Sequence, residues 1–148
     1  MRLDRAWIAK NIPHHGRMCL LDEVVEWDAR HVLCRSATHR APDHPLRAHG
    51  RLGAAGGIEY AAQTMAVHGA LCGGTAGGRP EAGFLASLRN VRLQVLRFDD
   101  VEGDLISSAT LVAGDGGTAL YEFALRSDAR QLMSGRATVV FDAGQLKL

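Results

Sequence analysis

The order of apolar and polar residues predicts a long helix in the first half of the chain, with strands on both sides of it. A short amphipathic helix follows Asp4 as its N-cap and runs to about Asn11. The long helix covers residues 54–71. The strands are predicted at residues 19–27, 31–38, 84–98, 104–112, 118–126 and 131–141, and their alternation of apolar and polar positions is clearest in 118–126.

The segments between these elements are predicted to be loops and turns. Residues 39–53 contain prolines and glycines without a clear period, and residues 73–78 form a glycine-rich connector. Hairpin turns are predicted at 115–117 and 127–129. The order of elements predicts a single α+β domain over residues 1–148, in which an antiparallel sheet curls around the long helix. Because one sheet cannot cover that helix on every side, we expect a dimer in which two sheets pair edge to edge.

The long helix carries one acidic residue, Glu59, in a run of small, apolar or uncharged side chains. Such a helix is expected to be buried, and Glu59 with it. A buried carboxylate without a cationic partner is costly and tends to stay protonated, so the pattern favours a catalytic group. Gln63 lies four residues later on the same helix face and can hydrogen-bond to it. The alternative is that Glu59 caps the amide groups of a neighbouring loop.

Three histidines are candidates for a second catalytic residue beside Glu59. His44 and His49 lie in the loop before the helix, and His14 lies in a turn after Pro13, where a structural hydrogen bond is the alternative role. The backbone N–H groups of residues 53–57, at the glycine-rich helix start, could stabilise a negative charge on a carbonyl oxygen. Equally, these small residues could serve close packing.

Composition excludes several classes of protein. Hydrophobic residues make up 47% and charged residues 22% of the 148 residues, with net charge +1, which indicates neither disorder nor binding to nucleic acid. Cys19, Cys34 and Cys72 lack metal-site spacing and are predicted to be reduced thiols of a cytoplasmic protein. We expect no signal peptide, membrane span, metal or cofactor.

Two motifs resemble a known family. Residues 12–24 read IPHHGRMCLLDEV, which is similar to the N-terminal signature of hotdog-fold 3-hydroxyacyl-(acyl-carrier-protein) dehydratases, and residues 57–63 read GIEYAAQ, which resembles their helix motif. The series PLR, GRL and GIEYAAQ is similar to the divergent branch associated with aryl-polyene and related lipid pathways. The resemblance covers nearly the whole chain.

The resemblance implies dehydration of a 3-hydroxyacyl chain carried on acyl-carrier protein. It assigns Glu59 as the acid that protonates the departing hydroxyl, Gln63 as its neighbour, and the amide near Ala54 or Ala55 as the oxyanion donor. The base would be a histidine of the other subunit in a homodimer or a heterodimer with a related hotdog protein. The usual Gly-His-Phe-Pro-Gly motif is absent, and residues 43–47 read DHPLR instead. His44 is therefore the first candidate for the base, and His14 and His49 are the next candidates. Two alternatives are a hotdog acyl thioesterase, in which Glu59 activates water, and a non-catalytic subunit that pairs with an active dehydratase.

Overall fold

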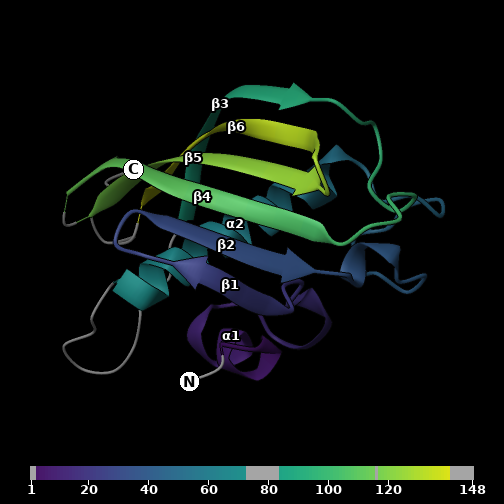
Figure 1. Cartoon of the computed structure of the whole chain (residues 1–148), viewed down its shortest axis with the longest axis horizontal. Helices are drawn as coiled ribbons and strands as arrows, with labels where there is room; N and C mark the ends of the chain where they lie inside the picture. The colour runs from purple at the N-terminus through teal and green to yellow at the C-terminus, as the bar shows by residue number, and fades with distance from the viewer. Residues whose placement is uncertain (1–2, 73–83, 116, 141–148) are drawn as a thin grey trace.

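One antiparallel sheet and one long helix make up most of the molecule (Figure 1). The structure is a computed structural model that describes residues 3–72, 84–115 and 117–140. The sheet has six strands in the order β1-β2-β4-β5-β6-β3. The elements are α1 (Arg5–Asn11), β1 (Glu23–Trp27), β2 (His31–Ser36), α2 (Ala54–Cys72), β3 (Phe84–Leu93), β4 (Leu105–Gly114), β5 (Thr118–Ser127) and β6 (Arg130–Val140), with short 3₁₀ turns at Gly16–Met18 and Thr38–Arg40.

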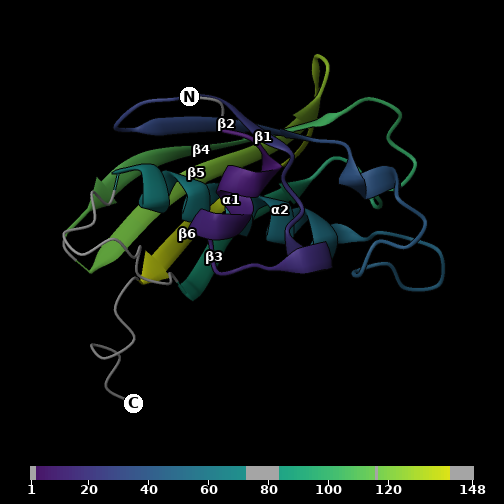
Figure 2. The ribbon, with the colours of Figure 1, turned by 90° about the horizontal axis from the view of Figure 1, so that it is seen from below.

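The helix α2 lies along one face of the sheet, where it packs against β2, β4 and β5 (Figure 2). It contains many alanine and glycine residues, whose small side chains let it approach the strands closely. Tyr60, Met65 and Val67 are buried in the resulting core. The predicted α+β arrangement, with the sheet wrapped around the long helix, is therefore confirmed.

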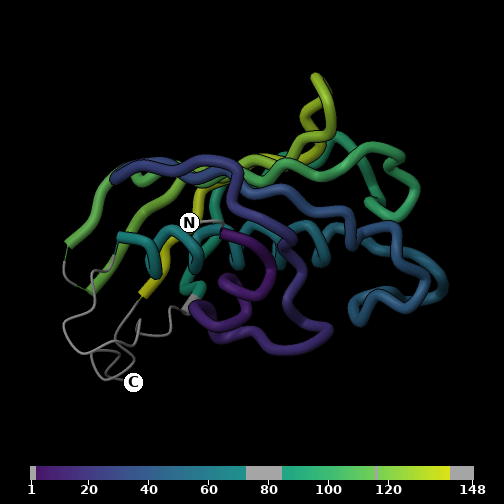
Figure 3. The backbone as a smooth tube through the Cα atoms, turned by 60° about the horizontal axis from the view of Figure 1, so that its bottom comes forward, coloured from purple at the N-terminus to yellow at the C-terminus, as the bar shows by residue number. Residues whose placement is uncertain are grey.

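The helix α1 contacts α2 and lies beyond β1, at that edge of the sheet (Figure 1). The predicted N-cap is confirmed, because the Asp4 carboxylate accepts a hydrogen bond from the Trp7 N–H at 3.0 Å. Ile8 is fully buried. The chain after α1 then runs beside α2 toward β1 (Figure 3), which brings the first predicted motif close to the second.

The strand β5 shows most directly how alternation sets the core. Tyr121, Phe123 and Leu125 are buried against the helix side, whereas Glu122 and Arg126 are exposed on the outer face. Side chains that point alternately to the two faces of a strand produce this pattern.

Several predicted boundaries differ from the observed ones. The strand predicted at 19–27 begins only at Glu23, because the backbone of Leu20 bonds to a helix side chain instead of a neighbouring strand. The strand predicted at 84–98 ends at Leu93. The turn at 127–129 is confirmed, and Asp128 adopts a positive φ of 52° there. The connector 73–78, residue 116 of the other predicted turn and residue 141 of the last predicted strand lie outside the described residues.

The strand β3 forms one edge of the sheet and is exposed along the part whose side chains are described. Its residues Leu85, Leu88 and Leu93 are opposite the buried residues Val139, Ala137 and Met133 of β6, so they point to the helix side. They are nevertheless 38%, 39% and 45% exposed. Within the described part of the chain, no helix has both the length and the hydropathy needed to cross a membrane.

Candidate active site

Glu59 lies in the second turn of α2, where two side chains hold the same carboxylate oxygen. The Nε2 atom of His14 is 2.9 Å from Oε1 of Glu59. The side-chain amide of Gln63 donates to the same Oε1 at 3.1 Å. The structure thus brings together three of the predicted site residues, Glu59, Gln63 and His14.

The expectation that Glu59 is buried, unpaired and protonated is wrong. Its side chain is 28% exposed and pairs with His14. The hydrogen bond from His14 is the largest influence on its pKa, which is lowered from the usual value, and the bond from Gln63 acts in the same direction. Glu59 is therefore ionised at neutral pH. This state could not be predicted from the otherwise uncharged helix, because the partner of Glu59, His14, lies in the loop after α1.

The ionised state of Glu59 also determines which nitrogen of the His14 ring is the donor. A carboxylate can only accept hydrogen bonds, so Nε2 of His14 must carry the proton that it shares with Glu59. In the neutral ring, Nδ1 is then unprotonated, and this atom is buried without a hydrogen-bond partner among the described residues.

Gln63 is fully buried and joins the helix to the loop that carries His14. Its side-chain oxygen accepts from the Leu20 N–H at 2.9 Å. Its side-chain nitrogen donates to the Met18 carbonyl at 2.6 Å as well as to Glu59. These bonds fix the orientation of the amide, so the predicted pairing of Glu59 with Gln63 is confirmed. Oε2 of Glu59 has no hydrogen-bond partner among the described residues.

His44 occupies a different environment within the same chain. It is 5% exposed, and its Nδ1 accepts from the Leu46 N–H at 3.0 Å. Its Nε2 therefore carries the proton and donates to the Tyr60 hydroxyl at 3.1 Å. Burial is the main cause of its lowered pKa, so the ring is neutral. Both ring nitrogens are engaged, and among the described residues no hydrogen bond or ion pair joins His44 to Glu59 of its own chain.

The Tyr60 hydroxyl continues this chain of hydrogen bonds further into the core. It lies 2.6 Å from Oγ1 of Thr38, which donates to the Leu20 carbonyl at 2.7 Å. Burial raises the pKa of Tyr60 to about 12, so it remains a neutral phenol. This role of Tyr60 was not predicted from the sequence, although a polar hydroxyl next to Glu59 in an apolar helix is a signal that could have revealed it.

The remaining predicted residues lie at the surface or at the helix start. His49 is exposed at a loop tip and has a positive φ of 54°. Ala54 and Ala55 begin α2, and Ala55 is exposed in the first turn, where backbone N–H groups lack acceptors within the helix.

Gly56 and Gly57 have a packing role. A Cβ atom at Gly57 would lie 2.7 Å from the Phe98 ring and 2.9 Å from the Met133 methyl group. At Gly56, a Cβ atom would lie 2.4 Å from Cδ1 of Leu52. The close-packing explanation for the glycine-rich helix start is therefore correct for these two positions.

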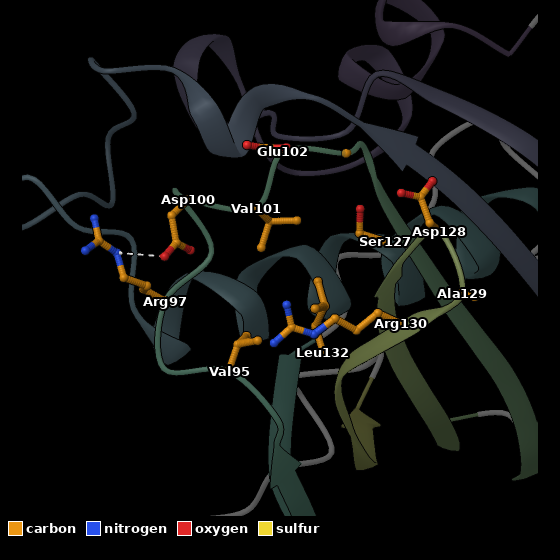
Figure 4. Close-up of a pocket in the computed structure, with 11 residues that line it drawn as sticks. Val95, Arg97, Asp100, Val101, Glu102, Ser127, Asp128, Ala129, Arg130 and Leu132 are labelled. Carbon is orange, nitrogen blue, oxygen red and sulfur yellow. Dashed lines mark ion pairs between the residues drawn. The ribbon is translucent and has the colours of Figure 1, made fainter.

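A cleft of about 730 Å³ opens between the segment after β3 and the β5–β6 turn (Figure 4). Charged side chains face it, among them Arg97, Asp100 and Arg130. None of the predicted catalytic residues lines this cleft. Within the described residues, no group of three or more histidine, cysteine, aspartate or glutamate side chains could hold a metal ion. The three cysteines are free thiols, as predicted.

The comparison with solved structures identifies the fold. A chain of "The Dehydratase Heterocomplex ApeI:P from Xenorhabdus doucetiae" superposes with a TM-score of 0.82 at 24% identity, covering 94% of this chain and 93% of that chain. The PaaI protein from the phenylacetic acid degradation operon of E. coli gives 0.63 at 11% identity, covering 92% and 88%. A mutant of the thioesterase PA1618 from Pseudomonas aeruginosa gives 0.58 at 13% identity, covering 80% and 78%. These matches confirm the predicted hotdog fold.

The sequence comparisons identify the family. No curated protein matches the chain. The family described as ApeP dehydratase matches residues 6–147, nearly the full length, and includes the segments that carry His14, Glu59 and Gln63. The chain therefore belongs to the ApeP-like dehydratase family.

Proposed function

We propose that the protein dehydrates a 3-hydroxyacyl thioester, carried on acyl-carrier protein, to the trans-2-enoyl form. The pathway would be fatty-acid or polyene-type lipid biosynthesis in the cytoplasm. Membership of the dehydratase family supports the reaction type. The observation that carries the proposal is the Glu59 carboxylate, whose Oε1 is held by His14 and Gln63 while Oε2 has no hydrogen-bond partner among the described residues.

The proposed chemistry begins with ionised Glu59. An ionised carboxylate can donate a proton only after it has received one, and dehydration releases a proton from C2 of the substrate. Glu59 would take the C2 proton at Oε2, and the electron pair would form the C2–C3 double bond as the C3–O bond breaks. The proton would then pass from Glu59 to the departing hydroxyl, which leaves as water. Glu59 thus acts as an acid only in the second half of the reaction.

His14 and Gln63 would act as positioning residues. Both donate to Oε1, so they fix the carboxylate plane and leave Oε2 toward the substrate. The Ala55 N–H at the start of α2 is the proposed donor to the thioester oxygen, where negative charge develops after proton removal. Ala54 is the alternative donor.

The prediction that His44 is the base is retained as a competing proposal for proton removal. The motif resemblance supports this role, in which His44 would remove the proton from a substrate bound at Glu59 of the partner subunit. For this role His44 must release the Leu46 N–H that now occupies Nδ1. The two proposals differ in the histidine whose replacement reduces activity.

A second subunit would complete the molecule. The apolar residues Leu85, Leu88 and Leu93 on the open edge strand support edge-to-edge pairing, as a homodimer or with a related hotdog subunit. The similarity to the ApeI:P heterocomplex supports a hotdog partner. Acyl-carrier protein is the proposed donor of substrate.

A hotdog thioesterase is the second candidate. The ionised state of Glu59 favours it, because a carboxylate base can activate a water molecule for attack on the thioester. The fold similarity to the PA1618 thioesterase is consistent with this alternative. The third candidate is a non-catalytic subunit, which the missing Gly-His-Phe-Pro-Gly motif favours.

One assay separates these candidates. The purified chain is given a 3-hydroxyacyl thioester on phosphopantetheinylated carrier protein, and enoyl absorbance and free thiol are followed together. Enoyl product supports dehydration, and free thiol supports hydrolysis. A non-catalytic subunit is indicated if the chain alone forms neither product, and if enoyl product appears after a hotdog partner is added, whether or not Glu59 has been replaced.

Variants then test the assignment of residues. We expect Glu59→Gln to reduce kcat by roughly 100-fold or more, because general acid–base groups contribute on that scale. His14→Gln is expected to give a smaller loss, since Gln63 still holds Oε1. His15→Gln is the matched control, because His15 is exposed and makes no side-chain cap bond. Full activity of Glu59→Gln would contradict the site, and a large loss in His44→Gln alone would favour His44 as the base.

A further inference from the structure

We infer that β3 pairs with the edge strand of a different hotdog subunit whose outward-facing residues are acidic, and that the arginines of β3 disfavour pairing with a second copy of this chain. This inference rests on the subunit pairing in the proposed function and specifies the partner. The positive charges concerned are those of Arg89 and Arg92 on β3 and Arg136 on β6.

The open edge of β3 is suited to pairing. The strand is ten residues long, and an edge strand presents unpaired N–H and C=O groups along its free side. The opposite edge, β1, is five residues long and is partly covered, because the Val24 N–H donates to the Leu3 carbonyl at 2.9 Å. On the helix side, β3 carries the exposed apolar residues already described, which a second hotdog subunit would cover.

The outer face of β3 carries positive charge. Arg89 and Arg92 are exposed, and among the described residues neither has an ion-pair partner. Arg89 is directly opposite Arg136 of β6, and Arg136 is directly opposite Glu122 of β5. Arg136 and Glu122 form an ion pair at 2.8 Å. A row of charges therefore crosses three strands: it is negative at Glu122 and positive at Arg136 and Arg89. Arg89 ends the row at the open edge of the sheet.

Pairing of two identical copies would extend this row unfavourably. When a strand pairs with itself around a two-fold axis, residues near its middle come close to their own copies. Arg89 lies near the middle of β3. The two copies of Arg89 would then approach each other on the outer face, with the two copies of Arg136 behind them. Residues directly opposite each other on adjacent strands have Cβ atoms about 5 Å apart, so like charges on them repel each other.

An acidic residue in the next strand would instead complete the row. It would place a negative charge beside Arg89, and a second acidic residue could face Arg92. A shallow groove of about 260 Å³ between Ser87, Arg89, Leu120 and Arg136 borders this position on the same face. A carboxylate that reached across the edge could lie beside both arginines. Charge would thus select the partner, while the apolar helix side would supply most of the buried area.

The full-length chain can test this by serving as its own acidic partner. The Arg89→Glu, Arg92→Glu double variant, labelled with ¹⁵N, is mixed with the unlabelled wild-type chain. Native mass spectrometry then measures the mixed and the two self-paired dimers. At about 0.02 M salt we expect the mixed dimer to exceed its statistical proportion, with its exchange constant raised roughly tenfold or more. The excess should shrink at about 0.5 M salt, where exposed charges are screened.

The matched control is Arg126→Glu. Arg126 is exposed on the outer face of the same sheet, but it lies on β5, two strands from the open edge. Its mixture with the wild type should remain statistical. A statistical mixture for the double variant would overturn the inference, as would wild-type dimers whose stability is independent of salt, or the absence of mixed dimers. Binding of an acidic carrier protein that is lost in the double variant, together with statistical mixing, would assign the arginines to the carrier instead.

The pairing result and the proposed function can fail separately. The mass measurement needs no substrate, and both arginines lie outside the Glu59 site. Selective mixed pairing by a chain that forms no enoyl product would retain the inference and reject the function. Dehydration by a chain that pairs statistically would do the reverse.

Discussion

Gln63 connects the proposed chemistry of Glu59 to the folding of the N-terminal segment. Its amide holds the carboxylate at one end and the Leu20 and Met18 backbone groups at the other. Those backbone groups belong to a segment without strand partners, so Gln63 satisfies hydrogen bonds that the sheet does not. A residue that first suggested catalysis thus also has a structural role.

Replacing Gln63 by Leu should therefore destabilise the fold. The change leaves the buried Leu20 N–H and the half-buried Met18 carbonyl without their partner, and a buried group left unpaired costs about 1–3 kcal/mol. We expect the free energy of unfolding to fall by roughly 2–5 kcal/mol in urea titrations followed by circular dichroism. Gln131→Leu makes the same change at an exposed position and should shift stability by less than about 0.5 kcal/mol. Equal effects of the two variants would contradict the role of Gln63.

At this scale, the sequence predicted which residues matter better than their chemical states. Glu59 and Gln63 could be found because a lone acid and an amide four residues apart share one face of a helix. The pairing of Glu59 with His14 could not be found in that way, because it depends on how a distant loop crosses α2. The lowered pKa of Glu59 follows from that crossing.

At the scale of elements, the start of α2 shows how glycine can serve packing inside a helix. Glycine is an unfavourable helix residue, so replacement by alanine usually stabilises a helix by up to about 1 kcal/mol. At Gly57, however, Phe98 and Met133 fill the space that a Cβ atom would need. Overpacking of this kind costs about 1–3 kcal/mol, so it should outweigh the gain in helix propensity.

We therefore expect Gly57→Ala to lower the melting temperature. The measurement is thermal unfolding followed by circular dichroism at 222 nm, the standard helix signal, with stability lowered by roughly 1–2 kcal/mol net. Gly53→Ala is the matched control, because no atom lies within 4 Å of a Cβ atom at Gly53. A variant at Gly57 that is as stable as the control would show that Phe98 and Met133 move aside at little cost.

The positions of the elements were predictable where alternation or composition is strong. Strand β5 alternates over its whole length, and α2 is set apart by its small and apolar residues. The early start predicted for β1 was wrong because Cys19, Leu20 and Leu21 are apolar and buried without being in a strand. Apolar residues indicate burial, but the partner of their backbone is decided by tertiary structure.

On the scale of the whole molecule, the fold buries three histidines in addition to pairing His14. His39, His44 and His68 are each nearly or fully buried, and burial is the largest cause of the lowered pKa of each ring. The folded chain therefore keeps these rings neutral at a pH where the unfolded chain would protonate them. Consequently the unfolded state binds more protons below about pH 6.5, the usual histidine value.

Stability should accordingly change little near pH 7 and fall as the pH drops from about 6.5 toward 5, by up to about 1.4 kcal/mol per pH unit for each histidine that stays neutral only in the folded chain. Urea titrations over this range measure the slope. His68 accepts from the Tyr121 hydroxyl at 2.8 Å and donates to the Asp28 carbonyl at 3.1 Å, so glutamine can replace part of this pattern without titrating. His68→Gln should therefore reduce the slope, whereas His15→Gln, at an exposed position, should leave it unchanged. An unaltered slope in His68→Gln would contradict this prediction, because it would show that the buried His68 ring binds its proton equally in the folded and the unfolded chain.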